Sequence, residues 1–262
     1  MFEKRNKVRA SLKKRLRNRD RIFGGWVSYR EPAIAETFAM AGFDFVAIDM
    51  EHTTISTDQA NRIITGCHAE GVACLPRPVS QGIDYIKPLL EAGADGMIIQ
   101  MVNTPDEVKA LIEIQKFPPL GNRSYGVNRA HGYGFNFDDY ISSWNESSSF
   151  IIQVESIEAV ENIDGLIAYD EVDSVMIGPY DISGSVGVPG QTDHPLVRKA
   201  SEKVVEACAK RGIGCCTQIA DVTHESVETA FEDGFSFVIL SSDLFVLSNW
   251  ASQMRNMITK FS

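Results

Sequence analysis

Short apolar runs rich in β-branched residues alternate along the chain with segments of helical periodicity, such as QANRIITGCHAEG (59–71). The runs are FGGWVS (23–28), FVAIDME (45–51), ACLPRPV (73–79), GMIIQMV (96–102), FIIQVES (150–156), SVMIGPY (174–180), GCCTQI (214–219) and FVILSSD (237–243). Strand-then-helix units pair their strands in parallel, and eight such units close into a barrel. We therefore predict a single α/β domain, a (β/α)8 or TIM barrel. The alternative is an open doubly wound sheet, but no GxGxxG turn follows the first run.

Glycines mark the ends of the helical segments, as expected for left-handed C-terminal caps. They are Gly42, Gly71, Gly93, Gly212 and Gly234. Ser56 and Thr104 stand where helix N-caps are expected. The length of 262 residues also fits one barrel, which typically takes about 250.

The first 21 residues differ in charge from the rest of the chain. They hold ten Lys or Arg against Glu3 and Asp20, a balance of +8, whereas the whole chain carries −10. We interpret residues 1–21 as a basic, solvated, partly helical leader and residues 22–262 as the barrel domain. No aromatic residue is interleaved with these charges, so we expect no nucleic-acid binding. No apolar run approaches the roughly 20 residues of a membrane span, so we expect no membrane contact.

Cysteine usage favours a cytoplasmic protein with reduced, buried thiols. The cysteines are odd in number and form no CxxC motif: Cys67, Cys74, Cys208, Cys215 and Cys216. The N-terminus shows no secretion signature.

Ionisable side chains follow the second apolar run, in FVAIDMEHTTIS (45–56). Asp49, Glu51 and His52 stand where a buried strand ends, and charge is costly to desolvate in a core. In these barrels, chemistry sits at the C-terminal ends of the strands. We therefore expect the three residues to border a polar cup.

The other strand ends supply further polar groups to the predicted cup. They are Arg77 after the third run, Gln100 after the fourth, Gln153 and Glu155 on the fifth, and Gly178, Pro179, Tyr180 and Asp181 after the sixth. Glu155 and Asp181 are hard oxygen ligands that suit Mg²⁺ or Mn²⁺. Such a metal would act as a Lewis acid for the enolate of an α-keto acid.

Arg77 and His52 complete the predicted chemistry. Arg77 is an always-charged donor for a carboxylate or an enolate oxygen. His52 is the natural proton carrier. Structural roles remain open for each: Glu155 could cap a helix, Arg77 could form a surface ion pair, and His52 could be purely structural. A Schiff-base route needs a lysine in the cup, and no strand end offers one, which favours the metal route.

Together these motifs resemble the HpcH/HpaI aldolase family, the metal-dependent pyruvate aldolases of the phosphoenolpyruvate/pyruvate barrel superfamily. The matching stretches are FDFVAIDMEHTTIS, LPRPV, LLEAGADGMIIQMVNTPDE, PPLGNRSYGVNRAHGYG, IIQVESIEAVENIDGL and GPYDISGSVGVPG, which run from about residue 23 onward. The resemblance implies a lyase that reversibly cleaves a 4-hydroxy-2-oxo acid to pyruvate and an aldehyde through a metal-bound enolate. The partners would be small molecules, the 2-oxo acid and the aldehyde.

The resemblance also assigns roles to individual residues. Glu155 and Asp181 would bind the metal, which would be Mg²⁺ or Mn²⁺, with Co²⁺ a further option. Arg77 would contact the enolate, and His52 would transfer the proton. Asp49 and Glu51 would hold a metal-bound water or orient His52; Gln153 and the backbone around Gly178 and Pro179 would contact pyruvate.

The family resemblance further implies a homo-oligomer, typically a hexamer, whose subunits exchange the C-terminal helix. Here that helix would span about residues 244–261. Its apolar stripe of Leu247, Trp250, Met254 and Met257 would serve this exchange, or pack as an ordinary eighth barrel helix.

Three positions depart from the family pattern. Ser124 replaces a glycine in GNRS, within a connection (117–149) that we expect to be an ordered loop near a polar ligand. Tyr180 replaces an alanine found in many relatives and would narrow the aldehyde side of the substrate site or hydrogen-bond the aldehyde. Glu91 stands where some relatives carry an aspartate coupled to the histidine, across a subunit interface in some cases. The GPYD version favours a hydroxylated, sugar-derived aldehyde.

Two other functions stay open at this point. One is an acyl-CoA lyase of the citryl- or malyl-CoA type, although no extra basic pocket for a nucleotide is visible in the sequence. The other is a non-catalytic barrel that binds a partner through its basic leader.

Overall fold

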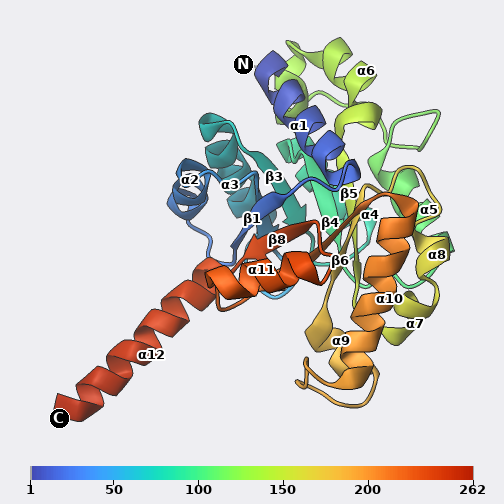
Figure 1. The fold of residues 1–262 in the computed structure, drawn as a ribbon. Coiled ribbons are helices and arrows are strands. Elements are labelled where there is room, and N and C mark those ends of the chain that lie inside the picture. The colour runs from blue at the N-terminus through green and yellow to red at the C-terminus, as the bar shows by residue number, and fades with distance from the viewer. Residues whose placement is uncertain (1, 262) are drawn as a thin grey trace.

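The computed structural model describes residues 2–261 and contains the eight expected strands, which form a nearly closed barrel (Figure 1). All seven recorded strand pairings are parallel, in the order β3-β2-β1-β8-β7-β6-β5-β4, and the outer strands β3 and β4 contact each other. The predicted (β/α)8 fold is thus confirmed. The strands are β1 (Ile22–Val27), β2 (Phe45–Asp49), β3 (Ala73–Arg77), β4 (Gly96–Ile99), β5 (Ser149–Val154), β6 (Ser174–Ile177), β7 (Gly214–Ile219) and β8 (Phe237–Leu240).

Helices alternate with the strands, and most of them cover the outside of the barrel (Figure 1). They are α1 (Phe2–Arg17), α2 (Pro32–Met40), α3 (Thr57–Glu70), α4 (Ile83–Ala92), α5 (Pro105–Gln115), η1 (Arg129–Gly134), α6 (Phe137–Ser147), α7 (Ile157–Glu161), α8 (Ile163–Leu166), α9 (Pro179–Ser185), α10 (Pro195–Arg211), α11 (His224–Glu232) and α12 (Asp243–Phe261). Ser56 and Thr104 form capping boxes at α3 and α5, and Gly71 ends α3 with a φ of 79°, as the sequence predicted.

Side chains alternate along each strand between two apolar layers. On β2, Phe45 and Ala47 point into the barrel, whereas Val46 and Ile48 face the helices. The interior layer also contains Leu75 of β3 and Ile151 of β5. Because the side-chain period is two, the next inward positions on these strands are Asp49, Arg77 and Gln153, where the core gives way to polar groups.

The basic N-terminal segment is helical, as expected, but one of its sides is buried against the barrel. Leu12 and Leu16 of α1 are buried in the cluster that fills the barrel interior. Lys13 Nζ lies 2.7 Å from an oxygen of the buried Asp173, and Arg9 Nε donates to Ser147 Oγ over 2.8 Å. The prediction of a solvated leader was therefore wrong for one side of α1. Leu12 and Leu16 pack onto the barrel, and Arg9 and Lys13 are paired there. Met1 and Ser262, the ends of the predicted domain ranges, lie outside the described residues.

The long connection after α5 is ordered by η1 and α6. Helix α6 packs against α1, and its Tyr140 and Trp144 are buried. The guanidinium of Arg123 lies 4.7 Å from the ring centre of Trp144 and donates to the Tyr140 hydroxyl over 3.1 Å. The expected ordered loop is present, and a role near a ligand stays a prediction.

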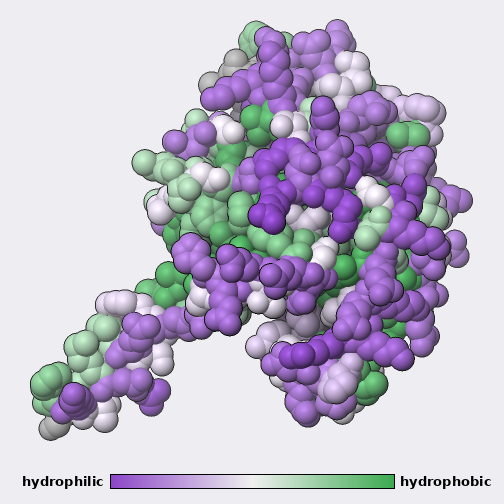
Figure 2. Space-filling model, viewed as in Figure 1, coloured by the Kyte–Doolittle hydropathy of each residue, from purple (hydrophilic) through white to green (hydrophobic). Residues whose placement is uncertain are grey.

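Helix α12 differs from the other helices because it extends away from the barrel (Figure 1). Asp243, its first residue, is its one buried residue among those described. Figure 2 shows apolar and polar side chains side by side along this helix. Its exposed apolar residues include Leu244, Leu247, Trp250 and Met257.

The helices and the cysteines bear on the predictions about membrane spans and reduced thiols. Within residues 2–261, no helix has both the length and the apolar character needed to cross a membrane. All five cysteines are buried and free, as predicted.

Lys116, at the end of α5, is buried where α5 meets the start of β5. Its Nζ donates to Ser148 Oγ over 2.7 Å and to the carbonyl oxygens of Ser148 and Asn145. Burial, together with the nearby positive charge of Lys13, lowers the pKa of Lys116 to about 7.

The low pKa of Lys116 predicts a pH-dependent stability. Between about pH 7 and pH 10 the unfolded chain holds a proton at this lysine that the folded chain lacks, so the free energy of unfolding should rise with pH. The contribution is up to about 1.4 kcal/mol per pH unit. Urea unfolding at pH 7 and pH 9 should show a smaller rise for Lys116→Met than for the wild type. Equal rises in the two proteins would contradict the assignment.

Candidate active site

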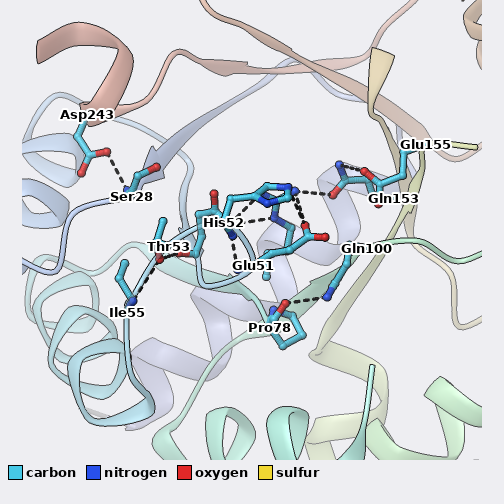
Figure 3. Close-up of polar contacts among 12 residues, drawn as sticks. Ser28, Glu51, His52, Thr53, Ile55, Pro78, Gln100, Gln153, Glu155 and Asp243 are labelled. Atoms are coloured by element: carbon cyan, nitrogen blue, oxygen red, sulfur yellow. Dashed lines mark hydrogen bonds and ion pairs between the residues drawn. The ribbon is translucent and has the colours of Figure 1, made fainter. Parts of the chain in front are cut away.

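Polar side chains from several strand ends meet at one end of the barrel and form the expected cup (Figure 3). Asp49 ends β2, and Arg77, its register partner, ends β3. Gln153 lies on β5, and Glu155 directly follows the end of this strand. All four are buried, with at most 6% of each residue exposed. The cup is therefore a desolvated site in which charges interact strongly.

Arg77 connects the acidic residues of the cup. Its Nη2 and Nε donate to one oxygen of Asp49 over 2.8 and 3.2 Å, and its Nη1 lies 2.8 Å from Glu51 Oε2. The same Nη1 donates to Gln153 Oε1 over 3.3 Å. The ring of Trp26 on β1 lies 4.8 Å from the guanidinium carbon. These contacts fix the guanidinium plane, so Arg77 offers a rigid cationic surface to a ligand.

Asp49 also shapes the turn that presents His52. One Asp49 oxygen accepts hydrogen bonds from the backbone N–H groups of Glu51 and His52 over 3.1 and 3.3 Å. This turn leaves the imidazole 63% exposed, with its Nε2 3.6 Å from Glu51 Oε2. His52 thus lies at the mouth of the cup, where a proton can pass between substrate and solvent.

Glu155 is held through both of its carboxylate oxygens. Oε1 accepts from the backbone N–H of Met101 over 2.6 Å, and Oε2 accepts from Gln153 Nε2 over 2.8 Å. Because Gln153 accepts from Arg77 in turn, a continuous chain of hydrogen bonds runs from Asp49 to Glu155. The orientation of Glu155 therefore depends on residues of β2, β3 and β5.

Negative charge is in excess in this cup. Burial, together with the negative charges of Glu51 and Asp181, raises the pKa of Glu155 to about 7. Burial likewise raises the pKa of Glu51, with Asp49 and Asp181 adding to the effect. Carboxylates that disfavour one another's ionisation in this way are suited to a shared cation.

The end of β6 approaches the cup closely at Gly178. A Cβ at this position would lie 2.7 Å from the Cβ of Glu155, so only glycine fits. Pro179 begins α9, and Asp181 follows in its first turn, exposed to solvent. Tyr180 is 67% exposed, which leaves its ring available to a ligand or to another subunit.

Ser124 and Glu91 form their polar contacts with residues that are not among the predicted cup residues. Ser124 Oγ accepts from Lys87 Nζ of α4 over 2.9 Å, so its hydrogen bond leads away from the cup. Glu91 lies 3.1 Å from Arg123 and 3.8 Å from His131 within the same chain, rather than beside His52. The structure thus brings together Asp49, Glu51, His52, Arg77, Gln153, Glu155, Gly178 and Asp181, but not Ser124.

Two residues of the cup escaped the sequence reasoning. Trp26 reads as an ordinary strand residue, and its ring contact with Arg77 depends on the neighbouring strands. Met101 acts through its backbone N–H, so its side chain carries no signal of the role.

The residues present fit a divalent metal held by two carboxylates. Among residues 2–261, no three His, Cys, Asp or Glu side chains gather as a metal-binding group. Glu155 and Asp181 are the two oxygen donors that the sequence singled out, and their mutual repulsion is what a bound cation would relieve. The remaining coordination positions would fall to substrate and water.

A (β/α)8 barrel with a desolvated acidic cup, a fixed guanidinium and an exposed histidine defines a carbon–carbon lyase of the aldolase type. The family model described as HpcH/HpaI aldolase/citrate lyase matches residues 23–249. The chain belongs to this family.

Individual relatives agree with this assignment. The chain is 33% identical over 202 residues to the 2-keto-3-deoxy-L-rhamnonate aldolase of Salmonella typhi, covering 76% of this chain and 74% of that protein. An HpcH/HpaI aldolase/citrate lyase family protein from Burkholderia cenocepacia J2315 superposes with a TM-score of 0.88 at 27% identity, covering 95% and 99% of the two chains. The citrate synthase SbnG superposes with a TM-score of 0.82 at 26% identity, covering 95% and 97%.

The buried pairing of Arg77 predicts a large stability loss when it is removed. Arg77→Met leaves Asp49 and Glu51 without their cation and should lower the free energy of unfolding by about 3–5 kcal/mol in chemical denaturation. Adding Asp49→Asn should restore part of this loss, because one buried charge is then absent. As a control, Arg62→Met removes an exposed pair with Asp58 and should cost less than about 1 kcal/mol. Equal losses for Arg77→Met and Arg62→Met would rule out the central role of Arg77.

Proposed function

We propose that the protein is a metal-dependent class II aldolase that reversibly cleaves a 4-hydroxy-2-oxo acid to pyruvate and an aldehyde. The observation that carries this proposal is the hydrogen-bonded chain from Asp49 through Arg77 and Gln153 to Glu155. It places a fixed cation beside an oriented carboxylate in a desolvated cup. That combination suits a substrate with a carboxylate and a neighbouring keto oxygen.

Glu155 and Asp181 would hold the metal, which would be Mg²⁺, Mn²⁺ or Co²⁺. When bound, the cation supplies a Lewis acid for the negative charge that develops on the keto oxygen. Oxygen donors favour a hard cation over a thiolate-binding metal, and the buried cysteines of the chain belong to the apolar core.

The chain's own residues account for binding and proton transfer. Arg77 binds the developing oxyanion or the carboxylate, with its guanidinium plane fixed by Asp49 and Trp26. Gln153 and the backbone at Gly178 and Pro179 line the pyruvate side. His52 takes the proton from the C4 hydroxyl as the C3–C4 bond breaks, and a proton returns to C3 when pyruvate is released. Asp49 and Glu51 fix the turn and the charge around His52.

The aldehyde is proposed to be a hydroxylated, sugar-derived one. The curated relatives that support this are named for 2-keto-3-deoxy-L-rhamnonate. Tyr180, exposed beside Asp181, offers a phenol that can hydrogen-bond a hydroxyl group of such an aldehyde.

We further propose that the protein works as a cytoplasmic homo-oligomer in which α12 packs on a neighbouring subunit, as in a hexamer. Helix α12 buries only Asp243 on its own chain among the described residues, yet exposes Leu247 and Trp250. Beside its base lies a cavity of about 490 Å³, lined by Phe38, Phe43, Val222 and Leu240 among others. An apolar helix from a second copy would cover both surfaces.

Exchange of the methyl protons of pyruvate for deuterium tests the aldolase chemistry. Proton NMR in D₂O should show metal-dependent loss of the pyruvate methyl signal, abolished by EDTA and restored by Mn²⁺ or Mg²⁺. Glu155→Ala and Asp181→Ala should reduce the rate by at least about 100-fold while the protein stays folded. Ser124→Gly should leave the rate within about threefold, because Ser124 pairs with Lys87 outside the cup.

A folded, metal-loaded protein without exchange would contradict the aldolase proposal. The acyl-CoA lyase would then be the next function to test, with citryl- and malyl-CoA as substrates. Retention on polyanions that is lost when the exposed Lys7 and Lys14 of α1 are changed to glutamine would instead support the binding protein.

The role of α12 in assembly can be tested by sedimentation velocity. Leu247→Asp combined with Trp250→Asp places charge in the apolar stripe and should shift the protein to a smaller oligomer. Asn256→Asp, an exposed polar position on the same helix, should leave the distribution unchanged. Wild-type protein that sediments as a monomer would refute the exchanged helix.

A further inference from the structure

Met101 holds an unusual backbone conformation directly beside Glu155. Its φ of 52° lies in the left-handed region that side-chain-bearing residues seldom adopt. The described residues contain three other non-glycine examples, at Arg19, Tyr133 and Ser241. Met101 is the one whose N–H donates to Glu155, over 2.6 Å. A strained residue in contact with a functional group points to a role in the site.

Gln81, in the connection between β3 and α4, holds this conformation from the other side. Its Nε2 donates to the carbonyl oxygens of Gln100 and Met101 over 2.7 and 2.9 Å. The Gln100 carbonyl and the Met101 N–H belong to the same peptide unit, and a trans peptide directs them to opposite sides. By holding the carbonyl edge, Gln81 therefore directs the N–H edge toward Glu155.

The rest of the loop supports the same peptide units. Asn103 Nδ2 donates to the Met101 carbonyl over 3.2 Å, and the Asn103 side chain accepts a hydrogen bond from Ser156, the residue after Glu155. Asn162 Nδ2 donates to the Asn103 carbonyl over 2.8 Å. The ends of β4 and β5 are thus tied together on both sides of Glu155.

We propose that Gln81 and the left-handed Met101 are positioning residues that orient the Glu155 carboxylate for a divalent cation. This inference rests on the proposed metal-dependent function and goes beyond it, since neither residue is one of the proposed metal ligands. Met101 donates to Oε1 and Gln153 donates to Oε2, so rotation of the carboxylate is restricted while each oxygen keeps a lone pair for a cation. Fixing a ligand before the cation arrives removes an ordering cost from binding.

Backbone substitutions at Met101 separate this role from a side-chain contribution. Met101→Gly keeps the N–H and favours the left-handed conformation, whereas Met101→Val keeps an apolar side chain but disfavours that conformation. Tyr133→Val is the matched control, because Tyr133 has a φ of 56° and is 69% exposed in the long loop. Gln81→Met removes the amide donor at similar size and leaves residue 101 unchanged.

The measurement is the dissociation constant for Mn²⁺ alone, from titration calorimetry or electron paramagnetic resonance without substrate. Met101→Val should weaken Mn²⁺ binding by about tenfold and Gln81→Met by about threefold to tenfold, as expected for a misplaced carboxylate ligand. Met101→Gly and Tyr133→Val should stay within about twofold of the wild type. In the two weakened variants, pyruvate proton exchange should recover at saturating Mn²⁺, which a damaged fold would not allow.

Wild-type-like Mn²⁺ affinity in both Met101→Val and Gln81→Met would overturn the positioning role while leaving the metal site intact. If Met101→Val does not fold, Gln81→Met decides by the same criterion. A wild type that binds no Mn²⁺ would overturn the proposed metal site, and the positioning role with it.

Discussion

The burial of the Arg77 guanidinium is the interaction on which the rest of the site depends. A charge of this kind is stable in a desolvated cup only when its donors are paired. The structure pairs them with Asp49 of β2, Glu51 of the following turn and Gln153 of β5. Each partner is thereby fixed in turn: Asp49 shapes the turn at His52, and Gln153 holds one oxygen of Glu155. One cation thus sets the geometry of side chains from several elements.

The same cation does not neutralise the cup. Asp49 and Glu51 contact Arg77 directly, whereas Glu155 is reached only through Gln153, and Asp181 is exposed on α9. Because Arg77 contacts Asp49 and Glu51 but not Glu155, burial and the neighbouring negative charges raise the pKa of Glu155 to about 7. This unequal distribution also divides the cup into an acidic pair that contacts Arg77 and a second pair, Glu155 and Asp181, which are the ligands of the proposed divalent metal. This division is the physical basis of the proposed aldolase mechanism.

Local patterns in the sequence predicted the parts of the fold that depend on local physics. Strand runs, left-handed glycines such as Gly71 and capping residues such as Ser56 act within a few positions, and each was confirmed. The cup was also predictable. The inward positions that follow Ala47 and Leu75 are polar, and in a parallel barrel such positions lie together at the carboxyl ends of the strands. Those predictions needed only the side-chain period of two and the rule that parallel strands end together.

The parts that escaped prediction depend on partners far along the chain. Lys13 and Arg9 look solvated in sequence, but their partners Asp173 and Ser147 stand 160 and 138 positions away. Ser124 was expected near a polar ligand because of the motif around it. In the structure, the loop instead directs its hydroxyl toward Lys87. The role of Met101 depends on a left-handed φ that its residue type does not predict. Gln81, which donates to the Met101 carbonyl, lies in the connection after a different strand, β3.

The two ends of the barrel differ in role: one contributes to stability and the other carries the polar cup. Helix α1 packs Leu12 and Leu16 into the interior layer, so that end is a continuation of the core. At the other end, the inward positions carry Asp49, Arg77 and Gln153, whose burial costs free energy that apolar residues would not. A barrel can tolerate such a cup because its folding is stabilised elsewhere, by the two apolar layers. The strained conformation of Met101 is maintained in a similar way. Hydrogen bonds from Gln81 and Asn103 stabilise it, and in the proposed role it serves to orient the Glu155 carboxylate.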